Sequence, residues 1–196
     1  MSSLGGSRVA LLRDAHGRRS HACRRVFSAA AEILGESAGY DVSMPTLAAR
    51  ARLAPAAVTA HFPSVDAMFA ELYLHRVSAL PLDVDATAGA AARVSAALRA
   101  ITLVMVDETE LAAACSRALL RTDDAAVAAT RERIGAEVHR RVAAALGTGA
   151  WPEVLATVET LFWGALLQAQ SQRIGYREMA TRLDTMLALI LPGTDH

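Results

Sequence analysis

Helical periodicity runs through most of this chain, and prolines or glycines separate one periodic stretch from the next. Apolar residues recur three and four positions apart, as at Val26, Ala30 and Ile33, which is the spacing of one face of a helix. Alanine is abundant, while the β-branched and aromatic residues that strands favour are sparse. The chain is therefore expected to be all-α, with nine helices and no strand.

Composition limits the class of protein. Apolar residues make up 53% of the 196 residues, which is enough for a sizeable core and too much for a disordered chain. No 18 consecutive residues are apolar, so neither a membrane span nor a membrane partner is expected, and the polar N-terminus does not resemble a secretory signal. Cys23 and Cys115 are the only cysteines, which favours reduced thiols and a cytoplasmic location.

The net charge is zero, but the charges are unevenly distributed. Residues 1–60 carry eight arginines against four acids, whereas residues 61–196 carry twelve arginines against sixteen acids. This distribution indicates a basic, anion-binding end on a mildly acidic body. Every cationic side chain is arginine, which we interpret mainly as a composition bias, although arginine also suits phosphate contacts.

Residues 44–62 hold two very short helical segments, each opened by a proline. Ser43 can cap the first, which has Pro45 in its first turn, and Pro55 opens the second, which ends near His61. A helix of about seven residues is not stable alone, so both must pack on a longer helix. A bracing helix followed by a presented helix is the helix-turn-helix arrangement that reads the major groove of DNA. The alternative is an ordinary helix pair in a bundle.

Other signals predict where the remaining helices begin and end. The first long helix is expected to start near Arg18 and to stop at Gly39. Ser64 can cap the helix that follows the two short ones. Thr122 is expected to cap a later helix, with two aspartates in its first turn, that ends at Gly147.

The stretch FSAAAEILGESAGYDVSMPTLAARARLAPAAVTAHFPSVDAMF resembles the N-terminal domain of the TetR family of bacterial transcriptional regulators. The matching positions are Gly39, Tyr40, Ser43, Leu47, Ala48, Ala51, Leu53, Val58, His61, Phe62, Ser64 and Met68. Residues 1–17 carry three glycines and little periodicity, so a flexible basic arm is expected there. The resemblance implies a helix-turn-helix DNA-binding domain over 18–63 and a helical ligand-binding and dimerisation domain over 64–196.

Four positions depart from the pattern of the family. Its turn glycine is Arg52 here, so this residue is expected to take a strained φ, or else the turn differs. The serine before the recognition helix is Ala54, and the aromatic and the lysine that usually contact phosphate are Thr59 and Val65. Two phosphate contacts are therefore weakened. A second interpretation stays open, a ligand-binding helical dimer with weakened or lost DNA binding.

The resemblance also implies which side chains meet double-stranded DNA. Arginines and hydroxyls would contact phosphates, while the second short helix offers Thr59 and His61 as donors and several alanine methyls to base edges. The predicted DNA-binding residues are Arg24, Arg25, Ser43, Thr46, Arg52, Ala56, Ala57, Thr59, Ala60 and His61, with Arg50 as a further phosphate candidate.

The resemblance implies that the C-terminal part holds a ligand pocket and a dimer interface, and the sequence is compatible with both. Helix 152–170 is apolar nearly all round, as a helix buried on two sides should be, and with helix 176–191 it can build a four-helix interface. Apolar side chains, with two arginines for an acidic head group, make the predicted pocket. The candidates are Phe69, Tyr73, Met105, Arg117, Arg121, Phe162, Trp163, Leu166 and Gln170. The alternatives are plain core and, for the arginines, surface ion pairs.

The sequence thus predicts a homodimeric transcriptional repressor that leaves a palindromic operator when an apolar or acyl-CoA-like small molecule binds. The segments LLRDAHGRRSHACRR and QSQRIGYREMATRLDTMLALIL resemble an actinobacterial TetR subgroup, the KstR-like sterol-catabolism repressors. That resemblance implies a steroid or an acyl-CoA thioester as inducer.

Catalysis is not expected. The chain has no glycine-rich phosphate loop, no nucleophile elbow and no HExxH motif, so we predict neither an enzyme nor a cofactor. His16, His21 and Cys23 lack the spacing of a metal site on a helix, and no metal is predicted. The acidic residues at 107, 108 and 110 are interpreted as a solvated helix end.

Overall fold

The structure, a computed structural model, describes residues 4–36, 42–82, 84–171 and 173–191, and of residues 4–19 it describes the backbone only. Within these ranges the chain forms nine α-helices, one short 3-10 turn and no strand, which confirms the predicted all-α class. No helix in the same ranges is long and apolar enough to cross a membrane. The chain divides into two compact units, Met1–Met68 and Phe69–His196.

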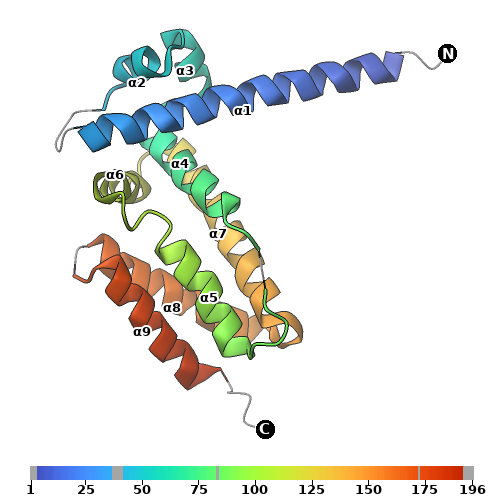
Figure 1. The fold of residues 1–196 in the computed structure, drawn as a ribbon, viewed down its shortest axis with the longest axis vertical. Coiled ribbons are helices and arrows are strands. Elements are labelled where there is room, and N and C mark those ends of the chain that lie inside the picture. The colour runs from blue at the N-terminus through green and yellow to red at the C-terminus, as the bar shows by residue number, and fades with distance from the viewer. Residues whose placement is uncertain (1–3, 37–41, 83, 172, 192–196) are drawn as a thin grey trace. The chain divides into compact units, whose positions relative to one another are not determined.

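The helices are named in chain order (Figure 1). They are α1 (Leu4–Glu36), α2 (Met44–Ala51), α3 (Pro55–His61), α4 (Val65–Ala79), α5 (Ala90–Thr102), α6 (Thr109–Leu119), α7 (Ala125–Leu146), α8 (Pro152–Gln170) and α9 (Tyr176–Ile190). The 3-10 turn, η1, spans Gly147–Gly149.

The first helix is longer than its sequence pattern predicts. It begins at Leu4 and not near Arg18, so the segment expected to be a flexible arm has a helical backbone from Leu4 onward. Alanine, leucine and arginine have high helix propensities and recur along this stretch, which offsets a cost of about 1 kcal/mol for each glycine. The helix ends at Glu36, and Gly39, where its end was expected, lies outside the described residues.

Apolar packing holds the two short helices in place. α2 and α3 contact each other and both contact α1 (Figure 1). Leu47 of α2 and Val58 of α3 are fully buried, and the rings of Phe27 and Phe62 lie 5.7 Å apart between their centroids. Ala48 is buried as well, because its small side chain lets α2 approach its neighbours closely. Packing therefore supplies the stability that helices of this length lack alone.

Side-chain caps begin α2 and α4 where the sequence predicts them. The Ser43 Oγ accepts a hydrogen bond of 3.3 Å from the Thr46 N–H. The Ser64 Oγ accepts one of 2.9 Å from the Ala67 N–H. Each cap satisfies one of the N–H groups that the first turn of a helix leaves without a partner.

The cap of α7 is not the predicted one. Asp124 is the cap and Thr122 is not, because the Asp124 carboxylate accepts hydrogen bonds of 2.9 and 3.1 Å from the N–H groups of Ala126 and Val127. Aspartate is at least as good a cap as threonine, and a run of three candidates does not reveal which one the chain uses. Gly147 ends α7 as predicted, at a φ of 62°.

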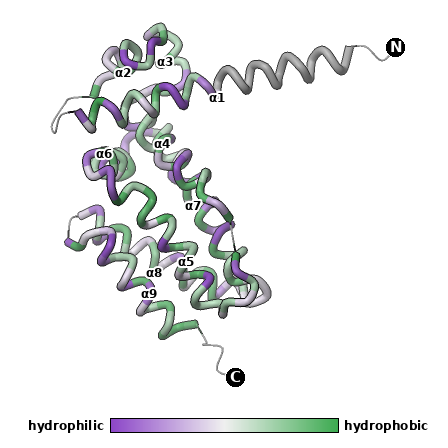
Figure 2. The backbone as a smooth tube through the Cα atoms, in the orientation of Figure 1, coloured by the Kyte–Doolittle hydropathy of each residue, from purple (hydrophilic) through white to green (hydrophobic). Residues whose placement is uncertain are grey.

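Several helices share the core of the second unit. α5 packs against α7 and α9, and α8 packs against both of the same helices (Figure 1). Leu98, Phe162 and Leu183, from three different helices, are completely or almost completely buried. Figure 2 shows hydrophobic residues in every helix of this unit, as expected of a helical domain with one shared core.

Arginines from neighbouring helices close the C-terminal ends of other helices in this unit. Arg93 of α5 donates a 2.7 Å hydrogen bond to the Ala145 carbonyl at the end of α7. Arg131 of α7 donates a 3.0 Å bond to the Leu119 carbonyl at the end of α6. A helix leaves its last carbonyls without partners, and the guanidinium fork presents several N–H groups to them.

Arg141 of α7 closes the end of α4 in the same way, from a buried position. It is 3% exposed and donates hydrogen bonds of 2.8 Å to the Leu80 carbonyl and 3.3 Å to the Pro81 carbonyl. Its Nε donates a 2.7 Å bond to the Glu137 carboxylate, which balances its charge. Nothing in the periodicity of the sequence distinguishes this arginine from its exposed neighbours.

Candidate DNA-binding surface and ligand cavity

The second short helix presents small side chains to solvent. Val58 points into the core, so the opposite face of α3 is accessible. The exposed or half-buried residues of α3 include all of the predicted base-contacting residues, Ala56, Ala57, Thr59, Ala60 and His61. Alanine methyl groups on such a face can contact the methyl group of thymine, and the narrow profile of the helix suits the major groove.

The Thr59 side chain offers an acceptor to DNA and not the predicted donor. Its hydroxyl donates a 2.7 Å hydrogen bond to the Pro55 carbonyl one turn earlier, so its hydrogen is engaged within the helix. The oxygen keeps a free lone pair and offers an acceptor, which matches the amino groups of adenine and cytosine. The ring of His61 lies edge-on to Phe62, with 6.3 Å between centroids.

The turn between α2 and α3 contains the strained residue that the sequence predicts. Arg52 has φ 53° and ψ 46°, the left-handed conformation that glycine adopts at no cost. The Arg52 N–H bonds to the Ala49 carbonyl at 3.1 Å, and the Leu53 N–H bonds to the Ala48 carbonyl at 2.9 Å, which is a Schellman end. Arg25 of α1 donates a 2.9 Å hydrogen bond to the Arg52 carbonyl and braces this turn.

The cap of α2 can also serve a phosphate. The hydroxyl oxygens of Ser43 and Thr46 lie 2.7 Å apart, and either can donate to the other. Whichever one donates, the hydrogen of the other hydroxyl remains available to a phosphate oxygen. Both residues are half-buried, so the pair is positioned by the same contacts that begin the helix.

A basic groove of about 630 Å³ lies between α1 and the end of α2. Four of its nine lining residues are arginines, so it can receive the anionic backbone of DNA. The lining residues are His21, Arg24, Arg25, Ser28, Ala29, Glu32, Arg50, Ala51 and Arg52. Arg24 is exposed and hydrogen-bonds the Ser20 hydroxyl at 2.7 Å.

Arg50 is engaged elsewhere. It forms a bidentate ion pair with Glu36, with both N–O distances 2.7 Å, and a longer contact of 3.5 Å with Glu32. The hydrogen bonds from Arg50 hold the pKa of Glu36 below its ordinary value. A phosphate contact by Arg50 stays a prediction, and it would have to compete with this ion pair, which links α2 to α1.

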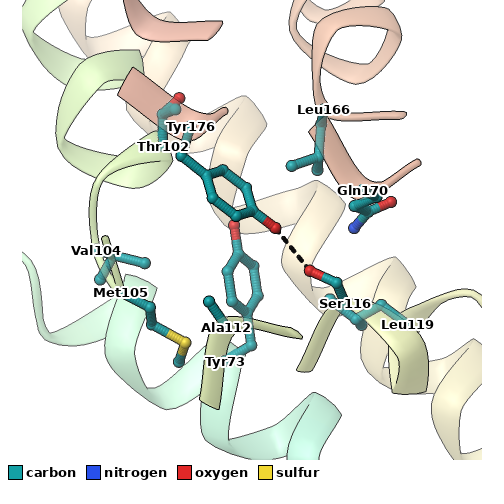
Figure 3. A pocket seen from close by; sticks show the side chains of 10 residues that line it. All are labelled: Tyr73, Thr102, Val104, Met105, Ala112, Ser116, Leu119, Leu166, Gln170 and Tyr176. Carbon is teal, nitrogen blue, oxygen red and sulfur yellow. Dashed lines mark hydrogen bonds between the residues drawn. The ribbon is translucent and has the colours of Figure 1, made fainter. Parts of the chain in front are cut away.

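The second unit contains an internal cavity of about 20 Å³, room for about one water molecule (Figure 3). Half of its lining residues carry a hydroxyl or amide group and half are apolar. They are Tyr73, Thr102, Val104, Met105, Ala112, Ser116, Leu119, Leu166, Gln170 and Tyr176. Four of the predicted ligand-binding residues are in this set, Tyr73, Met105, Leu166 and Gln170.

A larger groove of about 380 Å³ adjoins the cavity. Five residues line both spaces, and they therefore form the wall between them: Met105, Ala112, Ser116, Gln170 and Tyr176. In this wall the hydroxyls of Ser116 and Tyr176 lie 2.6 Å apart and join α6 to α9 (Figure 3). Arg117, another predicted residue, lines the groove.

Four predicted ligand-binding residues lie elsewhere. Phe162 is fully buried in the core of the second unit and Phe69 is nearly so, and neither lines the cavity or the groove. Trp163 is 37% exposed on the outer side of α8. Arg121 pairs with Asp123 at 3.0 Å on the surface, which is the alternative that the sequence leaves open for it. Met105 lines the cavity from the turns after α5, although its spacing predicts a position within that helix.

Sequence reasoning missed the polar residues of the cavity wall. Ser116 and Tyr176 carry no apolar periodicity, since one lies on a short helix and the other opens α9. Their pairing spans 60 positions in the sequence, which only the fold reveals. Thr102 hydrogen-bonds its own helix at the Leu98 carbonyl, 2.8 Å away, and shows no separate signal.

The acidic cluster between α5 and α6 forms surface ion pairs. Asp107 pairs with Arg177 and Glu108 with Arg76, each at an N–O distance of 3.0 Å. No group of three or more histidine, cysteine or acidic side chains in the described part of the chain is placed to hold a metal ion. His16 lies outside the residues whose side chains are described.

An apolar stripe follows the outer side of α8. Trp163 and Leu167, one turn apart, are 37% and 58% exposed, while the opposite side of the helix is buried against the core. On α9 Leu189 and Ile190 are also exposed. The helix that the sequence marks as apolar nearly all round is thus buried on one side and open on the other.

Comparison with known proteins agrees with this geometry. A family model described as bacterial regulatory proteins, tetR family, matches residues 26–72. An uncharacterized HTH-type transcriptional regulator of Mycobacterium bovis (strain ATCC BAA-935 / AF2122/97) is 42% identical over 179 residues, which cover 91% of this chain and 84% of that protein. A counterpart in Mycobacterium tuberculosis (strain ATCC 25618 / H37Rv) matches equally well.

A solved structure shares the fold. The crystal structure of a TetR transcriptional regulator from Rhodococcus sp. RHA1 matches with a TM-score of 0.69 over 90% of this chain and 99% of that one. At 17% identity this likeness concerns the fold alone. The helix-turn-helix of the first unit, the family match over it and the extensive identity to the mycobacterial regulators lead to one conclusion: the chain belongs to the TetR family and is a DNA-binding transcriptional regulator.

Proposed function

We propose that this regulator is a repressor that binds a palindromic operator as a homodimer and leaves it when a small molecule binds the second unit. The observation that carries the DNA-binding part is the accessible face of α3, held by α1 and α2 and accompanied by a groove that Arg24, Arg25 and Arg52 line. Two such helices related by a two-fold axis would enter successive major grooves about 34–36 Å apart.

The DNA-binding residues we propose are those that the sequence predicts, with Arg50 removed. Arg24, Arg25 and Arg52 would meet phosphates, and the Ser43–Thr46 pair would donate its spare hydrogen to another. The accessible residues of α3 would read base edges, with Thr59 as an acceptor.

Selection of bound sequences from random DNA tests this assignment. The expected result is an enriched palindrome, bound with an affinity that falls steeply with salt. Ala60→Glu should abolish binding, because it places a carboxylate on the accessible face of α3. Ala96→Glu, on the exposed side of α5, changes the net charge equally and should bind as the wild type does. Equal binding by the two variants would contradict the proposed reading face.

The proposed dimer interface is the open side of α8 together with α9. Exposed tryptophan and leucine on one stripe favour burial against an identical stripe, since an isologous contact pairs each surface with itself. Leu167→Glu is expected to give a monomer in sedimentation velocity and to weaken operator binding. Leu82→Glu, at a residue 44% exposed outside α8 and α9, serves as the control and should stay dimeric.

The ligand should weaken operator binding by the same factor by which the operator weakens ligand binding, because linkage is reciprocal. In the proposed mechanism α4 transmits the change to the DNA-binding unit. A steroid or an acyl-CoA thioester, implied by the resemblance to the sterol-catabolism subgroup, stays a prediction for the inducer. Titration of operator and ligand together tests the switch, and independent affinities would refute it.

A second candidate is a ligand-binding dimer that no longer binds DNA. It is favoured by Thr59, whose hydroxyl hydrogen is engaged with Pro55, and by Val65, which replaces a phosphate-binding lysine of the family. Such a protein would retain no DNA even at low salt, whereas a repressor would.

A further inference from the structure

The cavity and the groove of the second unit share one wall, and a hydrogen bond between two side chains of that wall joins α6 to α9. Ser116 of α6 and Tyr176 of α9 are 2.6 Å apart at their hydroxyl oxygens (Figure 3). If this bond is exchanged for one to a bound molecule, the 20 Å³ cavity and the 380 Å³ groove become one space. A space of that size is within the range of small-molecule sites.

The inner part of this space is polar but carries no formal charge. Its hydrogen-bonding groups are the hydroxyls of tyrosine, threonine and serine side chains and the amide of Gln170. None of the ten lining residues is an acidic or basic amino acid. The Tyr73 hydroxyl receives no hydrogen bond from any residue that the structure describes, so it is open to a partner. An empty core void is commonly lined by apolar groups alone, whereas the polar groups here can bond to a molecule that enters the space, a single water included.

The surroundings disfavour ions. Burial raises the pKa of the Tyr73 phenol well above its ordinary value, and burial raises the pKa of the nearby Cys115 thiol to about 12. Both groups therefore stay protonated at neutral pH, because a charge here would lose its hydration, and for Cys115 this loss outweighs the attraction of Arg76. An anionic ligand would suffer the same loss at this position.

We propose that this joined space binds an uncharged, mainly apolar molecule with one hydrogen-bonding group, which replaces the hydrogen bond between Ser116 and Tyr176. The apolar part would contact Met105 and Leu166, and the polar group would bond to the Tyr176 hydroxyl that Ser116 releases. The exchange separates α6 from α9 at this point. The inference rests on the proposed function, since it names the ligand class of the proposed regulatory site, and of the two predicted inducers it favours the steroid over the anionic acyl-CoA thioester.

Two dyes with one skeleton test the ligand class on the full-length protein without DNA. N-phenyl-1-naphthylamine is uncharged and has one N–H group, and its 8-sulfonate differs only by the anionic group. Fluorescence titration should show the uncharged dye binding at least tenfold more tightly than the sulfonate. An equal or tighter affinity for the sulfonate, lost in Arg117→Gln, would overturn the proposal in favour of an anionic ligand.

Two variants locate the bound dye. Ala112→Phe fills the wall from α6 and should weaken binding of the uncharged dye at least tenfold, while Ala136→Phe, on the exposed side of α7, should not change it. Ser116→Ala removes the hydrogen bond without adding bulk, so it should tighten binding roughly fivefold, the equivalent of one hydrogen bond that no longer has to break.

Ser116→Ala decides the question if Ala112→Phe does not fold. An unchanged affinity in Ser116→Ala would refute the exchange of hydrogen bonds, and an unchanged affinity in a folded Ala112→Phe would place the dye elsewhere. Operator binding by the same samples is measured separately. It tests the proposed function, whereas the dye affinities test the ligand class and the exchange of hydrogen bonds. A dye that binds as described but leaves operator affinity intact would refute the switch and not the ligand class.

Discussion

Replacement of Arg141 by alanine should destabilise the second unit strongly, whereas replacement of its neighbour Arg140 should not. The two arginines contact the same carboxylate oxygen of Glu137, at 2.7 and 2.6 Å. They differ in burial, because the side chain of Arg141 is 4% exposed and that of Arg140 is 51% exposed. Only Arg141 also bonds the carbonyls that end α4.

The magnitude follows from the contacts that Arg141→Ala removes. It leaves the half-shielded Glu137 with one partner and the carbonyls of Leu80 and Pro81 without their donor. Loss of one member of a buried ion pair costs about 3–5 kcal/mol. The hydrogen bonds to Glu137 and Leu80, at 2.7 and 2.8 Å, are short and charge-assisted, and at about 1.5–2 kcal/mol each they lead to a similar sum. Arg141→Lys should lower the free energy of unfolding by about half as much, since one ammonium group cannot bond both the Glu137 carboxylate and the carbonyls at the end of α4.

Urea unfolding followed by tryptophan fluorescence measures the effect. Both tryptophans, Trp151 and Trp163, lie in the second unit with Arg141, so the signal reports this unit. The midpoint of Arg141→Ala should fall sharply at a fixed protein concentration, and that of Arg140→Ala should stay within error of the wild type. Equal effects of the two substitutions would refute the reasoning, because burial would then not decide the contribution of the ion pair.

Three further predictions concern local structure. Arg52→Gly should stabilise the first unit by up to about 1 kcal/mol relative to Arg52→Ala in urea unfolding followed by circular dichroism, because only glycine relieves the left-handed φ. Asp124→Ala should cost about 1 kcal/mol by the same measurement, and Thr122→Ala should cost much less, since Asp124 is the cap. The hydrogen bond from Arg140 is the main cause that lowers the pKa of Glu137. The ionised Glu137 therefore stabilises the folded state above its unfolded pKa of about 4.3, and this stabilisation is lost as the pH falls through the lower folded pKa. Glu137→Gln should therefore flatten the acid side of the stability profile, and an unchanged acid side would contradict this assignment.

The fold follows from the sequence where local physics determines it. Proline and serine place the starts of α2, α3 and α4, and Gly147 places the end of α7, because each acts through its own backbone or nearest neighbours. The αL conformation of Arg52 is predictable for the same reason, since the turn requires it whichever residue is present. The start of α1 was misplaced because weak helix propensities add up over many residues.

The candidate sites follow less completely, because they depend on contacts between distant segments. Arg50 has the charge of a phosphate ligand, and only the approach of α1 shows that Glu36 neutralises it. Four of nine predicted pocket residues line the inner cavity, but the hydrogen bond that links α6 to α9 joins positions 60 residues apart. An aromatic or methionine in a helix pattern predicts burial, and burial alone does not separate core from cavity.

The arginines that bond the carbonyls at helix ends should tolerate replacement by lysine less well than the other arginines of this protein. Exchange of arginine for lysine preserves charge, and at solvent-exposed positions it would be neutral. At Arg93, Arg131 and Arg141 it would not be, because one ammonium group cannot span the carbonyls that a planar fork satisfies together. In related chains that use lysine, these three positions should therefore remain arginine, and lysine should appear at exposed positions that lack such contacts.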